Sequence, residues 1–173
     1  MTRIEAYTHD GLTFDVRDEG PLDGAPVVLL HGFPQRASSW DGVVPLLHAA
    51  GLRTYAPDQR GYSPGARPRR RRDYAFDHLI GDVEVLLAEI GQRVHLVGHD
   101  WGSSVGWLLA ARRPELVLSL VGVSVPHPAA FLGAMVLGDQ ALKSWYMAMF
   151  QLPWLPERLL STSRGEHALR VGG

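Results

Sequence analysis

Short apolar runs separated by polar turns fill the first 125 residues. Residues 3–8 and 12–17 predict two strands, because the Asp10-Gly11 dipeptide between them is typical of a hairpin turn. Four further apolar runs predict buried strands, at residues 26–30, 52–56, 93–97 and 116–123.

Apolar residues at helical spacing predict helices between these strands. The clearest stripe covers residues 76–90, and residues 101–113 predict a second helix that Pro114 ends. Ser39 is expected to cap a third helix, which starts at Trp40, breaks near Pro45, resumes and closes at Gly51. This alternation predicts an α/β fold, with a mostly parallel sheet covered by helices on both faces.

The pattern changes after residue 127. An aromatic-rich helical stripe follows, formed by Ala141, Leu142, Trp145, Tyr146, Met149 and Phe150. A polar tail from residue 161 has no recognisable element. We therefore predict a core over residues 1–127, and a helical insertion with a polar tail over residues 128–173.

The amino-acid composition excludes several classes of protein function. The 173 residues carry 17 Lys and Arg against 18 Asp and Glu, and no cysteine, which excludes disulfide scaffolds, thiolate nucleophiles and cysteine metal sites. No histidines stand at metal-ligand spacing, so we expect neither metal nor cofactor. The chain shows no secretory signal and no bilayer-spanning run, and we expect a cytoplasmic protein with no membrane partner. Oligomeric state is not encoded in any feature we recognise.

One basic run stands out against this background. Five of the six residues from 67 to 72 are arginine, and the rest of the chain carries 12 basic and 18 acidic residues. The run is interrupted by Pro68 and contains no aromatic residue that could stack on a base. These features favour a solvated loop over a nucleic-acid site, so we expect no nucleic-acid partner.

The strongest chemical signal is the sequence Gly-His-Asp-Trp-Gly at residues 98–102, between a predicted strand and a predicted helix. The spacing Gly-x-nucleophile-x-Gly is that of a sharp turn that exposes its central side chain. With Asp100 at the centre, serine esterase chemistry is disfavoured, and the carboxylate can form an ester with an electrophilic carbon. The alternative is that Asp100 only caps the helix.

A second signal is the sequence His-Gly-Phe-Pro at residues 31–34, directly after an earlier apolar strand. The backbone N–H groups of Phe33 and Trp101 are candidate donors of an oxyanion hole. Pro34 has no N–H and can only shape the loop. His31 is expected to be a buried hydrogen-bonding residue rather than a general base.

These two motifs and the sequence Asp-Gln-Arg-Gly-Tyr-Ser at residues 58–63 together resemble the α/β-hydrolase superfamily, from about Leu12 to Glu157. The resemblance is closest to the epoxide-hydrolase and haloalkane-dehalogenase branch, and it implies the first part of an α/β-hydrolase fold followed by the start of a helical lid. It also implies a small-molecule substrate. The 58–63 loop is interpreted as support, through contacts of Asp58 and Arg60 with neighbouring backbone.

The lid resemblance favours epoxide hydrolase. Tyr146 stands four residues before Phe150-Gln151, as in the lid of those enzymes, and would donate to the epoxide oxygen during ring opening. The alternative is that Tyr146 is only an aromatic residue of the stripe. The expected substrate pocket consists of His31, Pro34, Trp145 and Phe150.

The base that would hydrolyse the ester is missing from its expected place. Downstream of Asp100 the histidines are His127, directly after a strand, and His167, in the tail. We therefore expect the front part of an epoxide hydrolase, which would be alkylated without turning over. The alternatives are a haloalkane dehalogenase, which would use Asp100 with Trp101 as halide donor, and a non-catalytic relic of the fold. Phe33 stands where such dehalogenases often carry Asn.

Overall fold

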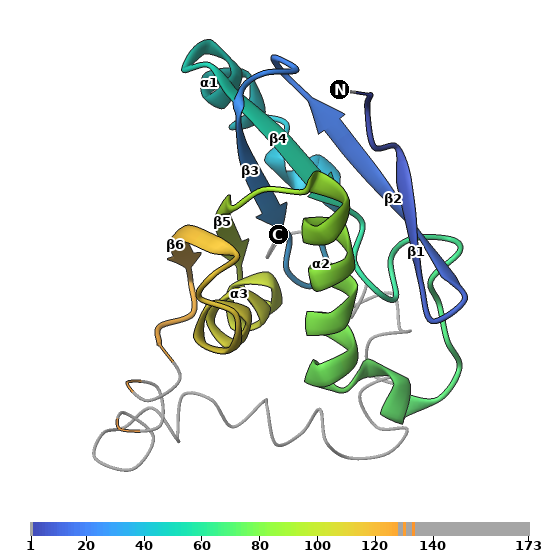
Figure 1. The fold of residues 1–173 in the computed structure, drawn as a ribbon. Helices are drawn as coiled ribbons and strands as arrows, with labels where there is room; N and C mark the ends of the chain where they lie inside the picture. Colours follow the sequence, from blue (N-terminus) through green and yellow to red (C-terminus); the bar gives the residue numbers. More distant parts are fainter. Residues whose placement is uncertain (1, 128–129, 131–132, 134–173) are drawn as a thin grey trace, which may run out of the picture. The chain divides into compact units, whose positions relative to one another are not determined.

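The structure is a computed structural model that describes residues 2–127, 130 and 133. Figure 1 shows its elements in chain order. They are β1 (Ala6–His9), β2 (Leu12–Glu19), β3 (Ala25–Leu30), the 3₁₀ helix η1 (Ala37–Trp40), α1 (Val44–Ala49), β4 (Leu52–Pro57), the 3₁₀ helix η2 (Arg71–Tyr74), α2 (Phe76–Ile90), β5 (Val94–His99), α3 (Trp101–Arg112) and β6 (Val117–Val123).

The strands form one six-stranded sheet in the order β1-β2-β4-β3-β5-β6. β1 and β2 pair antiparallel, as do β2 and β4, whereas β4, β3, β5 and β6 are parallel to their neighbours. At the predicted hairpin, Asp10 and Gly11 have φ values of 50° and 74°. Two successive positive φ values are typical of the tight turn that matches strand twist, so this prediction is confirmed.

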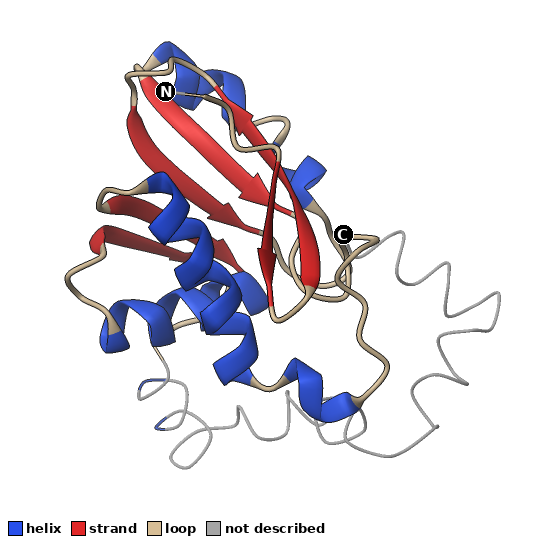
Figure 2. Cartoon of the chain, turned by 45° about the vertical axis from the view of Figure 1, so that its right-hand side comes forward, coloured by secondary structure: helices blue, strands red, loops and turns tan. Residues whose placement is uncertain are grey.

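Both faces of the sheet are covered, as the sequence predicts. Side chains alternate along β3: Val28 and Leu30 belong to the larger core, to which α2 and α3 contribute. Val27 and Leu29 face the other way and pack with Trp40 and its neighbours in η1 and α1. Figure 2 shows helices on either side of the sheet. The α/β class is therefore confirmed.

The predicted helix between Trp40 and Gly51 is interrupted, as expected, but its start and its cap are wrong. Residues Ala37–Trp40 form the 3₁₀ helix η1 instead, and α1 begins only at Val44. Ser39 lies inside η1 and does not cap a helix. The physical reason is Pro45, which has no N–H and is tolerated in the first helical turn, so the helix starts beside it. The loop of residues 58–73 also contains more structure than expected, because it runs into η2.

The remaining boundaries agree to within a few residues. The helix over residues 76–90 is confirmed at both ends, and α3 ends at Arg112, one residue before the prediction. Clustering of contacts divides the chain into Met1–Pro126 and His127–Gly173. Within the residues that the structure describes, no helix has the length and apolar character needed to cross a membrane.

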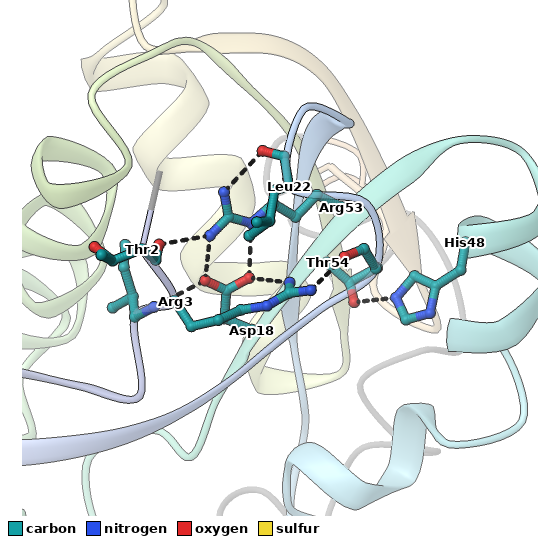
Figure 3. A network of polar contacts seen from close by, with 9 residues as sticks. Thr2, Arg3, Asp18, Leu22, His48, Arg53 and Thr54 are labelled. Atoms are coloured by element: carbon teal, nitrogen blue, oxygen red, sulfur yellow. Dashed lines mark hydrogen bonds and ion pairs between the residues drawn. The ribbon is translucent and has the colours of Figure 1, made fainter.

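A buried ion pair ties the start of the chain to the sheet (Figure 3). Asp18 of β2 and Arg53 of β4 are 1% and 2% exposed, and two Arg53 nitrogens donate to the two Asp18 oxygens at 2.8 and 2.5 Å. Arg53 also donates to the carbonyls of Leu22 and Thr2, and the Ile4 N–H donates to Asp18. Because every charge has partners, the pair can remain buried.

The same contacts set the protonation of Asp18. Burial of the carboxyl would raise its pKa, but hydrogen bonds from Arg53, the Ile4 N–H and Arg3 outweigh burial and hold the pKa below its ordinary value. The unfolded chain therefore binds this proton more readily. The stability that Asp18 contributes is present above the ordinary carboxyl pKa and is lost as the pH falls through the lowered value.

We predict that Asp18→Asn lowers the free energy of unfolding by about 3 kcal/mol at neutral pH, because Arg53 keeps a buried charge without its counter-ion. Urea unfolding monitored by circular dichroism measures this. The difference from the unsubstituted protein should shrink as the pH falls from the ordinary carboxyl pKa of about 4 through the lowered pKa of Asp18. Asp23→Asn, in the exposed turn before β3, is the matched control and should change stability by less than about 0.5 kcal/mol.

Candidate active site

Asp100 lies at the turn between β5 and α3, in a backbone conformation that residues other than glycine rarely adopt. Its φ and ψ are 51° and −116°. The Asp100 side chain makes no capping hydrogen bond to α3, so the interpretation of Asp100 as a helix cap is wrong. A strained backbone conformation of this kind costs about 1–3 kcal/mol, so it persists only where the surrounding structure enforces it.

Close packing of two glycines enforces this turn. A Cβ on Gly98 would lie 2.5 Å from the carbonyl oxygen of Gly102, and a Cβ on Gly102 would collide with the carbonyl oxygen of Leu30. β5 pairs with β3 so that Gly98 stands opposite Leu30. The start of α3 therefore packs directly on the end of β3, which only residues without a side chain allow.

The close packing of α3 on β3 also brings the loop after β3 to the Asp100 carboxylate. The backbone N–H of Phe33 donates to Asp100 Oδ2 at 3.0 Å. A Cβ on Gly32 would lie 2.5 Å from the Asp100 Cβ, so Gly32 is needed for this contact. The Phe33–Pro34 peptide bond is cis, and both side chains are exposed. The Phe33 N–H is thus aimed at the candidate nucleophile, while the Trp101 N–H as second donor stays a prediction.

His31 is completely buried, and both ring nitrogens are in use. Its Nδ1 donates to the Gly32 carbonyl at 2.9 Å, and its Nε2 accepts from the Gln59 N–H at 3.0 Å. Burial lowers the pKa of His31, which keeps the ring neutral. This agrees with the expected hydrogen-bonding role. A place for His31 in the substrate pocket is not supported, because its ring has no exposed surface.

The loop over residues 58–63 makes the expected contacts with neighbouring backbone, through Asp58 and Arg60. Asp58 accepts from the Ala37 N–H at 2.8 Å, so it fixes the segment that follows Pro34. Arg60 donates to the Asp73 carbonyl at 3.1 Å. It also forms a buried double hydrogen bond with Asp82 of α2, at 2.6 and 2.7 Å, which the sequence did not predict. The two residues are 22 positions apart in the sequence, so no local pattern indicates that they pair.

Tyr62 is a site residue that the sequence analysis missed. Its ring meets the His31 ring edge-on, with centroids 4.6 Å apart. The pKa of Tyr62 is raised to about 12, first by burial of the phenol and then by the negative charge of Asp100. The phenol therefore stays protonated at neutral pH. Its place in the Gly-Tyr-Ser part of the loop motif was the signal available in the sequence.

Phe76 is a second missed residue. It begins α2, and its ring lies 5.7 Å from that of Trp101, which begins α3. The Trp101 side chain is 51% exposed, so this contact orients a large aromatic surface next to Asp100. The sequence analysis placed Phe76 in the apolar stripe of the helix, because the spacing of apolar residues was the only signal at this position.

Three predicted site residues, Tyr146, Trp145 and Phe150, lie outside the described residues. Among the residues that are described, no group of three or more His, Asp or Glu side chains could hold a metal ion.

Comparison with known proteins shows the family of the chain. Residues 25–159 match the model of the family described as alpha/beta hydrolase fold. The AB hydrolase superfamily protein YfhM of Bacillus subtilis is 40% identical over 153 residues, covering 87% of this chain and 54% of that protein. Epoxide hydrolase 3 of Xenopus tropicalis is 36% identical, with 91% of this chain and 43% of that protein covered.

Solved structures give the same picture. An epoxide hydrolase from Vigna radiata superimposes with a TM-score of 0.76 at 34% identity, covering 91% of this chain and 50% of that one. A mutant of an epoxide hydrolase from Bacillus megaterium, complexed with its product, gives a TM-score of 0.84 at 28% identity, covering 96% and 57%. The chain thus spans about half the length of these relatives.

We predict that Gly102→Ala destabilises the protein by at least about 2 kcal/mol, because the added methyl group meets backbone rather than a flexible side chain. Thermal and urea unfolding measure the loss. Gly42→Ala is the matched control, since a Cβ at Gly42 has nothing within 4 Å, and it should alter stability by less than about 0.5 kcal/mol. Equal effects at the two glycines would contradict the packing described for the turn.

Proposed function

The chain belongs to the α/β-hydrolase family, and we propose that it carries the ring-opening half of an epoxide hydrolase, with Asp100 as nucleophile. The observation that carries the proposal is the strained Asp100 with the Phe33 N–H on one of its carboxylate oxygens. The names of several relatives support the substrate class.

The chemistry begins with the free carboxylate oxygen. Asp100 Oδ1 attacks one epoxide carbon, a carbon–oxygen bond of the ring breaks, and its electron pair stays on the former ring oxygen. That alkoxide needs a proton, for which we propose the Tyr146 phenol. The product of this step is an ester between Asp100 and the substrate, with the second hydroxyl already formed.

The Phe33 N–H would serve the following step. Oδ2 becomes the carbonyl oxygen of the ester and keeps its place beside the donor 3.0 Å away. When water attacks the Asp100 carbonyl carbon, negative charge grows on this same oxygen. A donor fixed there before reaction stabilises that charge without rearrangement. The Trp101 N–H is proposed as the second donor.

Hydrolysis of the ester also requires a base. In the described part of the chain, His31 is buried with both nitrogens engaged, and His99 Nδ1 is bonded to the Gln35 side chain at 2.9 Å. We therefore propose that the chain by itself stops at the ester. Haloalkane dehalogenation would use the same Asp100, and the exposed Trp101 indole is the feature that keeps it as second candidate.

We predict that incubation with a small terminal epoxide adds the mass of one epoxide to the intact protein, and that peptide mapping places it on Asp100. Asp100→Asn should abolish the adduct, because an amide is a poor nucleophile. Asp10→Asn, in the exposed β1–β2 turn, is the matched control and should react as the unsubstituted protein does.

The outcomes separate the candidates. A folded protein that forms no adduct on Asp100 contradicts the proposal and favours a non-catalytic relic. Stoichiometric halide release from a chloroalkane, with no reaction of epoxides, would assign dehalogenase chemistry instead.

A further inference from the structure

The peptide between Gly32 and Phe33 carries the proposed oxyanion donor, the Phe33 N–H, and the loop after β3 holds its carbonyl. His31 Nδ1 donates to the Gly32 carbonyl at 2.9 Å, and the Gln35 N–H donates to it at 3.0 Å. On the opposite side of the same peptide, the Phe33 N–H donates to Asp100. The loop itself therefore fixes the direction in which the oxyanion donor points.

Different contacts set the distance between this loop and Asp100. Gly32 packs closely against the Asp100 side chain, and the pairing of β3 with β5 ends where Leu30 stands opposite Gly98. Close packing prevents a nearer approach, but it does not stop the two segments from moving apart. The hydrogen bond from Phe33 opposes such a separation, and it weakens when the charged carboxylate becomes a neutral ester.

A second hydrogen bond joins the same two segments through side chains. His99 directly precedes Asp100, and Gln35 follows Phe33 by two residues. His99 Nδ1 lies 2.9 Å from Gln35 Oε1. Because an amide oxygen can only accept, Nδ1 carries the proton and donates it to Gln35. This bond does not involve the carboxylate, so it remains intact when the nucleophile is converted to an ester.

We propose that Gln35 and His99 are positioning residues, which keep the oxyanion donor in place after the nucleophile has become an ester. This rests on the proposed function and deepens it. During ring opening the carboxylate loses negative charge, so a donor on Oδ2 stabilises the starting state more than the transition state. During ester cleavage negative charge grows on Oδ2, and a donor held at hydrogen-bond distance stabilises it. The pair therefore assists the second step and not the first.

The test measures the two steps separately. The Asp100 ester is formed with a small terminal epoxide, the excess epoxide is removed, and hydroxylamine is added. The hydroxylamine nitrogen attacks the ester carbonyl carbon, the bond from that carbon to the substrate oxygen breaks, and the diol leaves with a proton from the nitrogen. Asp100 becomes a hydroxamate, which intact mass distinguishes from both the ester and the acid. Hydroxylamine takes the place of activated water, so the cleavage requires no base from the chain.

Gln35→Met removes the acceptor of the side-chain bond and keeps the length of the side chain. It should slow cleavage by hydroxylamine about tenfold and change the rate of ring opening by less than about twofold. Gln35 and His99 line a cavity of about 190 Å³, which has room for the methionine side chain. Gln92→Met, in the exposed turn before β5, is the matched control and should leave both rates unchanged. In urea, where no donor is held in place, all the esters should be cleaved at one rate.

Two substitutions of His99 test the hydrogen bond itself. The amide nitrogen of an asparagine can take the place of Nδ1, so His99→Asn should keep the cleavage rate within about twofold of that of the unsubstituted protein. His99→Leu has no donor and should slow cleavage about tenfold. Combining His99→Leu with Gln35→Met should slow cleavage no further, because the two residues act through one bond.

The remaining outcomes separate this inference from the proposed function. If the Gln35→Met and Gln92→Met esters are cleaved equally fast, the positioning role is refuted and the proposed function stands. Equal slowing of ring opening and cleavage by Gln35→Met would show a general distortion of the site and would also overturn the inference. If no epoxide reacts, the proposed function fails, and hydrogen exchange of the Phe33 amide, followed by NMR, decides. Faster exchange in Gln35→Met than in Gln92→Met would support the positioning role, and equal exchange would refute it.

Discussion

The parallel pairing of β3 with β5 is the constraint on which the candidate site depends. It places Leu30 opposite Gly98. The segments that follow β3 and β5 therefore leave the sheet side by side, one leading to Phe33 and the other to Asp100. The contact between the Phe33 N–H and the carboxylate exists because backbone meets backbone at the glycines between them. The close packing around the strained turn at Asp100 leaves no space for a different backbone conformation.

Two buried ion pairs fix segments of the chain, and one of them holds a loop at this centre. Arg53 with Asp18 fixes the start of the chain to the sheet, away from the site. Arg60 with Asp82 does the same for the loop that carries Gln59 and so, through the Gln59 N–H, for His31. Pairs of this kind contribute more to choosing one arrangement than to total stability, because much of their attraction offsets the loss of hydration.

The proposed chemistry has two steps, which need different groups. Attack on an epoxide needs a carboxylate with a reactive oxygen, for which Asp100 is proposed. The growing charge of the later step needs a fixed donor, for which the Phe33 N–H is proposed. Hydrolysis needs a base as well, and the described histidines near the site already have other partners. The same chain can therefore be tested for ester formation separately from turnover.

Sequence pattern determined the strand and helix order, the hairpin at Asp10 and the turn at Asp100, because periodicity and glycine spacing act over a few neighbouring residues. It placed a break near Pro45, but it did not determine that residues Ala37–Trp40 form a 3₁₀ helix or that α1 begins at Val44. Tertiary structure alone decided that Arg60 pairs with Asp82, that Tyr62 packs on His31 and that Phe76 orients Trp101. These contacts join residues far apart in the chain, and no local pattern records which distant side chains the folded sheet brings together.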